Sequence, residues 1–437
     1  MMAMRARLNR ILKVRWTLRR FARDTTGAVA VMAALMFPVL VGGMALGAEA
    51  GYWYLSQRKL QQAADFAAHT GAVQLRSGRN NAEMVAAATK IAVGSSFVVG
   101  EDTLALRNPP TTGSRAGNPK AVEVTISRQQ TRYFTLIYST DDVDISARAV
   151  AEVRGGANAC LIALDPTASG AISMSGSPQV TLAGCAVATN SNAPNAFSTS
   201  GNPKLTADCL HSVGGVSTNP SHLNLTACTA PDTESPVVRD PYANLPEPHN
   251  VGTCASRSES RINRTTTVSL AETHPNGMRM RRYCDGLNIS GNGTVTFSPG
   301  LYIISGGSFS VSGSGVVQGS GVTFFLTNGA TIDFTGSAKI DLSAPSSGAL
   351  PGILFYGDRD DAGATHKSAG GGERIFNGAV YLPSGDLDWT GSSSVTNGCA
   401  QIITRRVKFS GNSSLKIDCS APGTRPSLAG EIIALVE

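Results

Sequence analysis

The sequence is poor in the side chains that most enzymes use for catalysis. Of its 437 residues only 16% are charged and 6% are aromatic, and histidine occurs six times. It contains no GxSxG, HExxH, P-loop or dinucleotide-binding motif. We therefore expect no catalytic residue and no cofactor. Glycine is abundant, with 47 residues, and this composition is typical of a turn-rich β protein.

Positive charge is missing from most of the chain. The net charge of +6 comes from residues 1–26, which hold eight basic residues and a single acid, Asp24. Residues 27–437 carry 29 basic and 30 acidic residues and are about neutral. Because a nucleic-acid-binding protein usually has a basic face, we expect no nucleic-acid partner.

Metal-binding cysteine patterns are absent as well. None of the eight cysteines belongs to a CxxC pair and the histidines do not cluster with them, which argues against zinc. All eight lie beyond residue 159, and an even number in one part of the chain indicates disulfides in an oxidising compartment. Sequence order suggests the pairs Cys160–Cys185, Cys209–Cys228, Cys254–Cys284 and Cys399–Cys419. This is one of about 105 possible pairings, and small buried thiols are the alternative.

What the sequence does contain is an uncharged, apolar run of 22 residues at 27–48. As a helix this run is about 33 Å long, against about 30 Å of bilayer hydrocarbon, and it predicts a transmembrane helix that Pro38 should kink. The basic tail places the N-terminus in the cytoplasm and the bulk of the chain on the other side of the inner membrane. A cleaved signal peptide is the alternative, since 48–50 reads Ala-Glu-Ala, although the run is longer than a usual signal core.

The far end of this run has the residues of a membrane interface. Tyr52, Trp53 and Tyr54 stand where an aromatic belt is expected. Glu49 falls at the same level rather than at the bilayer centre, so the cost of its desolvation should be modest.

Small residues recur every four positions along the same segment. Gly43, Gly47 and Gly51 form two overlapping GxxxG steps, which allow two helices to approach closely in lipid. The functional interpretation is a contact with a partner helix or a second copy of the chain. The alternative is that glycine is simply common in membrane helices.

The helical pattern continues beyond the membrane segment. A stripe of small residues runs from Leu60 to Gly71 with helical spacing, and 81–93 predicts a second helix. Strand-like runs follow at 121–127, 132–138 and 143–153. These elements predict a small membrane-proximal α+β domain.

The second half of the sequence is repetitive. The pattern apolar-[Ser/Thr]-Gly-[Ser/Asn] occurs seven times, with its glycines at 176, 201, 291, 313, 336, 391 and 411. Each copy predicts a strand, a turn in which glycine supplies a positive φ, and a second strand. Steps of 20–25 residues favour a Gly-rich parallel β-solenoid, and an antiparallel β-sandwich is the alternative.

Five prolines at 230–250 predict an extended connector. We therefore divide the chain into six predicted parts. They are a basic cytoplasmic tail (1–26), the transmembrane helix and interface (27–55), the α+β domain (56–155), a β-repeat segment (156–229), the Pro-rich connector (230–255) and a β-repeat or solenoid domain (256–437).

Two groups of oxygen-bearing side chains are weak candidates for a metal site. Asp165, Thr167 and Ser169 follow an apolar strand in a D-x-[ST]-x-S pattern that resembles the metal-binding loop of von Willebrand A domains, although Asp-Pro is also an ordinary turn signal.

The second group is acidic: Asp358, Asp360 and Asp361, with His366 and Glu373 nearby in sequence. It fits a calcium loop, the carboxylates of a polysaccharide-cleaving β-helix, or a solvated loop in a Gly-rich segment.

The N-terminal region resembles the start of TadE/TadG-like proteins of the Tad (Flp) pilus-assembly system, in the longer TadG-type form. The shared features are the basic stretch, Gly27 opening the helix, Pro38, an acidic residue at Glu49, and the sequence Leu-Gln-Gln-Ala-Ala-Asp at 60–65. Family members commonly carry Asp where this chain has Glu49. The 240–246 and 376–385 segments are also similar to the C-terminal regions of longer members.

The resemblance implies a structural or accessory role in pilus biogenesis, adhesion or biofilm formation, with other Tad pilus-assembly proteins as partners. We expect a non-enzymatic protein that spans the inner membrane once and carries a periplasmic or surface-exposed β region. The alternative is a membrane-tethered β-helix enzyme acting on polysaccharide.

Overall fold

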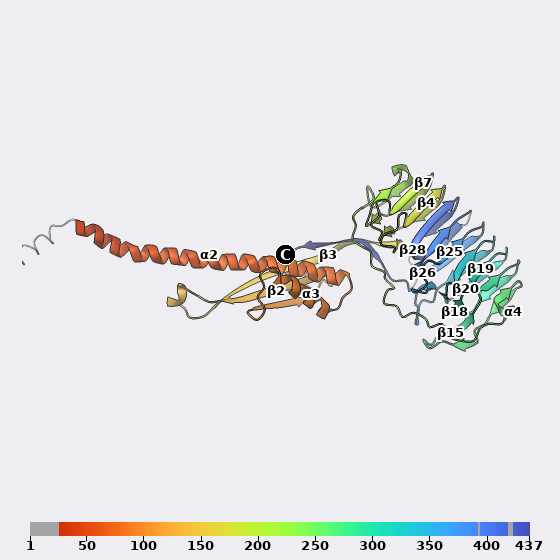
Figure 1. The fold of residues 1–437 in the computed structure, drawn as a ribbon, viewed down its shortest axis with the longest axis horizontal. Helices are drawn as coiled ribbons and strands as arrows, with labels where there is room; N and C mark the ends of the chain where they lie inside the picture. The colour runs from red at the N-terminus through yellow and green to blue at the C-terminus, as the bar shows by residue number, and fades with distance from the viewer. Residues whose placement is uncertain (1–25, 392–393, 418–422) are drawn as a thin grey trace, which may run out of the picture. The chain divides into compact units, whose positions relative to one another are not determined.

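The computed structural model describes residues 26–391, 394–417 and 423–437, and these form two compact units. Unit 1 contains the chain up to Val153 together with Ile433–Glu437, and unit 2 contains Arg154–Ile432. The chain thus leaves unit 1 through the strand β3 (Val143–Ala163) and returns to it through β30 (Leu428–Leu435) (Figure 1). Mainly β structure with an apolar N-terminal helix was expected and is confirmed.

Two helices form one layer of unit 1. Helix α2 (Thr26–Arg76) continues without a break through Pro38. The predicted second helix is confirmed as α3 (Asn81–Val93). It begins with a capping box, in which the Asn80 side chain accepts from the Glu83 N–H and the Glu83 carboxylate accepts from the Asn80 N–H.

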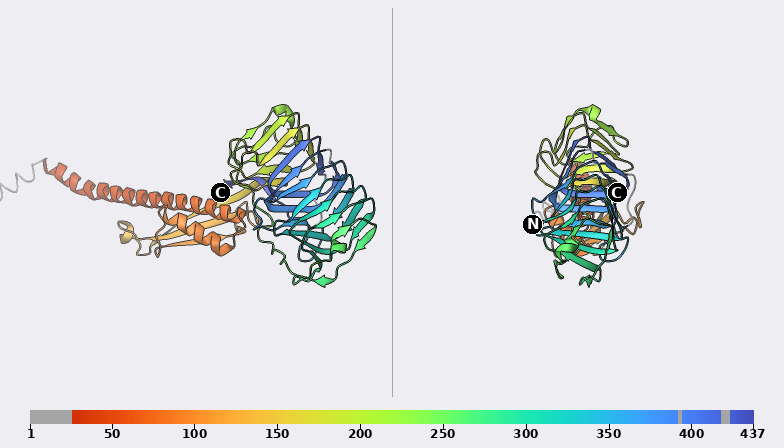
Figure 2. Two further views of the ribbon diagram at one scale, coloured as in Figure 1. Left: turned by 45° about the vertical axis from the view of Figure 1, so that its right-hand side comes forward. Right: turned by 90° about the vertical axis from the view of Figure 1, so that its right-hand side faces the viewer.

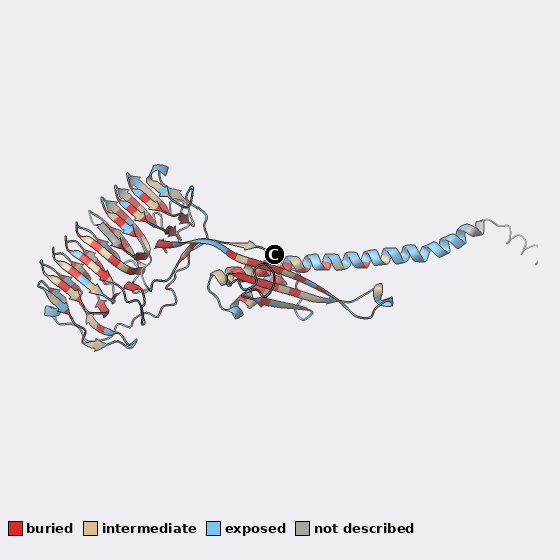
Figure 3. Ribbon diagram, turned by 180° about the vertical axis from the view of Figure 1, so that it is seen from behind, coloured by how far each residue is buried: buried red, intermediate tan, exposed pale blue. Residues whose placement is uncertain are grey.

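The second layer of unit 1 is an antiparallel sheet in which β2 (Ala121–Gln130) lies between β1 (Asp102–Arg107) and β3. The predicted strand at 132–138 is wrong, because these residues form a loop that contains the short 3₁₀ helix η1 (Thr135–Ile137). The stripe of small α2 residues is buried in this layer, and a Cβ added to Gly71 would lie 2.9 Å from Cγ1 of Val122. Figure 3 shows the contrast between the second half of α2, which is buried along one stripe, and its exposed first half.

An ion-pair network connects β2 and β3 to the C-terminal residue of the chain. The buried Glu123 accepts from Arg148 and from Thr111 and Thr112, and Arg148 also pairs with the side chain of Glu437. The backbone of the same terminal segment bonds to β3, since the Val150 N–H donates to the Glu437 carbonyl over 2.8 Å. Residues 433–437 are therefore part of unit 1 although unit 2 precedes them in sequence.

Unit 2 is built from three ladders of parallel strands, in which each strand pairs with the next (Figure 2). The first ladder consists of β15 (Arg279–Tyr283), β18 (Gly300–Ser305), β21 (Val322–Thr327), β24 (Ile353–Gly357), β26 (Glu373–Trp389), β28 (Ala400–Gly411), β3, β6 (Ala186–Thr189) and β9 (Leu210–Ser212). The second ladder consists of β12 (Arg261–Ile262), β16 (Leu287–Ile289), β19 (Ser308–Val311), β22 (Thr331–Phe334), β25 (Thr365–Ser368), β26, β28, β4 (Ile172–Gly176), β7 (Phe197–Gly201) and β10 (Val216–Ser217). The third ladder consists of β13 (Thr266–Val268), β17 (Thr294–Phe297), β20 (Val316–Ser320), β23 (Lys339–Ser343), β26, β27 (Ser394–Gly398), β29 (Ser414–Ile417), β5 (Gln179–Leu182), β8 (Lys204–Ala207) and β11 (Leu223–Leu225).

Antiparallel pairing is rare in this unit. Two short strands lie antiparallel to a ladder strand: β14 (Glu272–Thr273) pairs with β15, and β30 runs beside β3, where the Ala159 N–H donates to the Ser427 carbonyl. The antiparallel sandwich that the sequence left open is therefore not formed. Two short helical turns, η2 (Pro220–His222) and α4 (Arg257–Ser260), lie at the ends of the ladders.

The order of strands in space differs from their order in sequence. Strands β3, β4 and β5 pair with β28 and β29, so 156–229 continues the stack beyond its C-terminal strands. Residues 230–255 then connect one end of the stack to the other, where β12 and β13 begin.

The repeated glycines of the sequence lie in one column of unit 2. Neighbours in this glycine column follow the order Gly201, Gly176, Gly411, Gly391, Gly370, Gly336, Gly313 and Gly291. A Cβ added to Gly313 would lie 1.9 Å from the carbonyl oxygen of Gly291, and one added to Gly336 would lie 2.2 Å from that of Gly313. The expectation of a positive φ is confirmed for Gly176, among others, but wrong for Gly313 and Gly336, where close backbone approach alone requires glycine.

Aromatic side chains fill the interior of the stack. The rings of Phe309, Phe324 and Phe355 stack on one another, with centroids 4.7 Å and 5.4 Å apart. They belong to strands in successive layers, so the aromatic contacts follow the ladder direction.

The Pro-rich segment covers the outer face of the first ladder. Val238, Tyr242 and Leu245 are buried against it, and Arg359 donates to the carbonyl oxygens of Tyr242 (2.7 Å) and Leu245 (3.0 Å). This cover explains why strands such as β21 are buried on both faces and read as continuous apolar runs.

Candidate functional site: the outer end of the apolar helix

Helix α2 is the one helix in the described residues that is long and apolar enough to cross a membrane. From Val29 to Met44 its large apolar side chains are exposed, which means that no other part of the described chain covers them. This agrees with the predicted membrane segment.

The Glu49 carboxylate connects the helix to a loop far away in sequence. Its two oxygens accept the backbone N–H groups of Tyr133 and Thr135, each over 2.7 Å, and the residue is only 2% exposed. The expected interfacial Glu49 is therefore shielded by the protein's own loop. This partner was not foreseen, because a contact across 84 residues leaves no local signal in the sequence.

Two of the three predicted belt residues contact the loop that follows β2, and the third contacts its own helix. Tyr52 packs edge-on against Tyr133, and Trp53 lies beneath the guanidinium of Arg132, 5.6 Å from its ring centre. Tyr54 is exposed, and its hydroxyl accepts from Arg58 on the next helical turn over 2.9 Å.

The glycine stripe of α2 stays open. A Cβ added to Gly43, Gly47 or Gly51 would meet no atom within 4 Å. At about 100° per residue, Gly47 and Gly51 lie on the side of the helix opposite Glu49. The loop and the glycine stripe therefore occupy different faces.

The weak metal candidates have structural partners. Asp165 accepts the N–H groups of Thr167 (3.0 Å) and Ala168 (2.8 Å), which makes it the cap of its own turn, while Thr167 and Ser169 are exposed. In residues 26–391, 394–417 and 423–437, no three His, Cys, Asp or Glu side chains are grouped to hold a metal ion.

The side chains of the acidic group also have structural partners. Asp358 accepts from the Thr327 hydroxyl and Asp361 from the Gly329 N–H, so both hold the turn after β21. Asp358 also accepts from the Asp360 N–H, whereas Glu373 pairs with Lys339 on the third ladder. His366 is buried in the second ladder, and its Nδ1 accepts from the Ile332 N–H.

Three of the four predicted disulfides are formed: Cys160–Cys185, Cys209–Cys228 and Cys254–Cys284. Cys399 is also disulfide-bonded, but its predicted partner Cys419 lies outside the described residues. The disulfides join neighbouring layers of unit 2 or fasten the segments at its ends.

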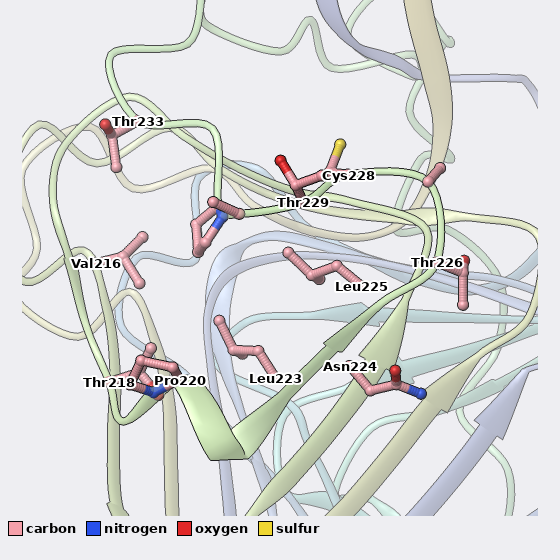
Figure 4. Close-up of a pocket in the computed structure, with 13 residues that line it drawn as sticks. Val216, Thr218, Pro220, Leu223, Asn224, Leu225, Thr226, Cys228, Thr229 and Thr233 are labelled. Carbon is pink, nitrogen blue, oxygen red and sulfur yellow. The ribbon is translucent and has the colours of Figure 1, made fainter.

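A surface pocket lies at one end of unit 2, beside β10 and β11 (Figure 4). Figure 4 shows Val216, Leu223 and Leu225 around it, together with Thr226 and Asn224. Its lining contains no acidic, basic or histidine side chain. The pocket therefore lacks the groups for acid–base chemistry.

Comparison with known proteins identifies the N-terminal segment. Residues 27–74 match the family described as putative Flp pilus-assembly, TadE/G-like. The resemblance expected from the sequence is thus confirmed for this segment. No curated protein matches the chain. Among solved structures, the competence-associated pilin ComZ from Thermus thermophilus is 10% identical, covers 78% of this chain and 88% of its own, and has a TM-score of 0.24. A TM-score this low carries no argument about the fold.

Proposed function

We propose that this protein is an inner-membrane-anchored component of a Tad (Flp) pilus-assembly system, with a structural role in pilus biogenesis, adhesion or biofilm formation. The observation that carries the proposal is the family match at 27–74, which coincides with the exposed apolar part of α2 and its outer end. The basic tail at 1–26 supports a cytoplasmic N-terminus, and unit 2 together with the part of unit 1 that follows Glu49 would then lie on the periplasmic side.

We further propose that unit 2 is a parallel β-solenoid and serves as a rigid scaffold. The three parallel ladders, the glycine column and the aromatic stack support this description. Disulfides suit an oxidising compartment outside the cytoplasm. Such a scaffold would present long strand edges and turns to a protein or glycan partner.

The role is proposed to be non-enzymatic. Of the candidate carboxylates, those of Asp358 and Asp361 are engaged in a turn and that of Glu373 pairs with Lys339. Paired catalytic carboxyls of glycosidases face each other across a substrate groove, and Asp361 and Glu373 instead bind different ladders.

The open glycine stripe is the proposed contact for another pilus-assembly helix or a second copy of the chain. Small residues at four-residue spacing let helix backbones approach closely, and Glu49 and its loop leave this face uncovered.

Co-purification from detergent tests this proposal. Replacing Gly43, Gly47 and Gly51 with leucine should remove the pilus-assembly proteins that co-purify with the full chain. As a control, Ala34→Leu adds a leucine to the same helix on the side away from the stripe and should leave the partners in place. Retention of all partners by the glycine variant would reject the helix contact, and absence of any pilus-assembly protein from the unaltered chain would reject the proposed system.

A further inference from the structure

The loop that Glu49 holds is unusually apolar for an exposed segment. Residues 133–138 read Tyr-Phe-Thr-Leu-Ile-Tyr, and five of these six side chains are large, apolar and exposed. Ile137 is 82% exposed and Tyr138 is 77% exposed. Loops that face water on all sides are usually polar, so this composition calls for a partner surface.

The loop is fixed rather than free. Arg132 donates to the Asp141 carbonyl over 2.7 Å and to the Thr135 hydroxyl over 3.3 Å, which ties the two ends of the loop together. Glu49 binds the backbone at its centre, and Arg132 lies over Trp53. The apolar side chains are therefore held outward beside α2 while the polar backbone is satisfied.

The point of attachment defines the level of the loop along the helix. Glu49 is the first residue after the uncharged run 27–48, whose length of about 33 Å matches the bilayer hydrocarbon. In Figure 1 the end of the β2–β3 hairpin reaches back along α2 toward its exposed N-terminal half. The loop thus lies where the hydrocarbon would give way to lipid headgroups.

The chemistry of the loop fits that level. Tyrosine and phenylalanine are favoured at the membrane interface, where an apolar ring meets a polar surface, and leucine and isoleucine add buried apolar area. Asp141 and Asp142 follow after two polar residues and are exposed, which suits the aqueous side of the interface.

We propose that residues 133–138 insert their exposed side chains into the lipid interface beside α2, and that Glu49 positions them there. The protein then contacts the outer face of the inner membrane at two places, the helix and the loop. This contact restricts tilting and rotation of unit 1 about the helix. The inference rests on the proposed membrane anchor.

Fluorescence quenching by lipid-borne bromine tests the insertion. The full chain is reconstituted in phosphatidylcholine vesicles brominated at acyl carbons ~6 and ~7, a depth just below the headgroups. Three variants each add one indole: Ile137→Trp in the loop, Phe37→Trp within the apolar run, and Ser77→Trp just after α2, about 40 Å along the helix from Glu49. The emission of the unaltered chain is subtracted from each.

We expect bromine to quench the I137W indole at least threefold more strongly than the S77W indole, and F37W to be quenched strongly as well. If F37W is quenched and I137W behaves like S77W, the loop is not in lipid and the inference is wrong, whether or not a protein covers it instead. If F37W itself is not quenched, the membrane anchor is wrong.

A second variant tests the role of Glu49. Adding Glu49→Ala to I137W should lower the quenching of the loop indole at least twofold, because the two backbone N–H groups lose their acceptor. The same change added to F37W should have no effect. Equal quenching of I137W with and without Glu49 would show that this carboxylate does not position the loop.

Discussion

Units 1 and 2 both depend on glycine and alanine, but for different physical reasons. In unit 1 the small α2 residues let a helix lie close to a sheet, and the tightest neighbour of Gly71 is a side-chain methyl of Val122 at 2.9 Å. In unit 2 the neighbour of Gly313 is the backbone oxygen of Gly291 at 1.9 Å. A side chain can change rotamer, whereas a backbone held in a hydrogen-bonded ladder has no room to move. The comparison teaches that tolerance to substitution depends on what the glycine faces.

The largest expected effect is that of Gly313→Ala. Because the new methyl would overlap the Gly291 backbone, we expect unit 2 to lose about 3 kcal/mol of its free energy of unfolding. Unit 1 should be unaffected. Hydrogen exchange followed by mass spectrometry resolves the two units separately. Gly371→Ala, at a glycine with nothing within 4 Å, is the matched control and should change little.

The second-largest effect is expected for Arg359→Ala, which should lower the free energy of unfolding of unit 2 by about 2 kcal/mol. It removes the hydrogen bonds to the Tyr242 and Leu245 carbonyls that hold the Pro-rich segment. The change should appear as faster hydrogen exchange in 238–247. Arg239→Ala, at an exposed arginine of the same segment, serves as the control. Equal exchange in both variants would mean that apolar burial alone retains the segment.

Acid should affect the two units in different pH windows. Burial alone would raise the pKa of Glu123, but the Thr111 N–H, Arg148 and Thr112 lower it to about 2. Its stabilising contribution to unit 1, about 3 kcal/mol, is complete above about pH 4.5 and is lost as the pH falls toward 2.

In unit 2, burial lowers the pKa of His366 to about 4, so this side chain stays neutral in the folded state while the unfolded chain takes up a proton below about pH 6.5. Unit 2 should therefore begin to weaken at a higher pH than unit 1. Proteolysis of the two units across a pH series measures this order. Glu437 and Asp102 of unit 1 also have lowered pKa values, so Glu123→Gln should reduce the acid step of unit 1 and leave that of unit 2 unchanged. A simultaneous loss of both units would contradict the comparison.

The smallest effect is expected for Gly71→Ala. The gain in helix propensity, up to about 1 kcal/mol, offsets the crowding against Val122. Thermal unfolding of unit 1 should shift little. A loss as large as that of Gly313→Ala would show that unit 1 is packed as rigidly as unit 2.

Features with a local or periodic signal were predictable from the sequence. The uncharged run of α2, the second helix at 81–93, three disulfides and the favoured parallel pairing were expected from spacing and composition. The strand expected at 132–138 was wrong because a short run rich in aromatic and β-branched residues fits a strand, while the contact that decides the structure comes from Glu49.

The irregular repeat intervals also have a structural explanation. The 90-residue step from Gly201 to Gly291 is the passage from one end of the stack to the other, which sequence order cannot reveal. The 55-residue step from Gly336 to Gly391 hides one layer, whose glycine is Gly370 in the sequence Ser-Ala-Gly-Gly. In that layer the Gly370 backbone still lies close to the backbone of Gly336, although the residues around it do not match the apolar-[Ser/Thr]-Gly-[Ser/Asn] pattern.

The central claim is that a single helix crosses the membrane and leaves unit 2 and the part of unit 1 after Glu49 outside the cytoplasm. Its most direct test is amine labelling of cells stripped of their outer membrane. A membrane-impermeant reagent should label Lys90 of unit 1 and Lys204 of unit 2, which are both exposed, and should reach Lys13 in the basic tail only after detergent is added. Labelling of Lys13 before detergent, or protection of Lys90 and Lys204, would contradict the proposed topology.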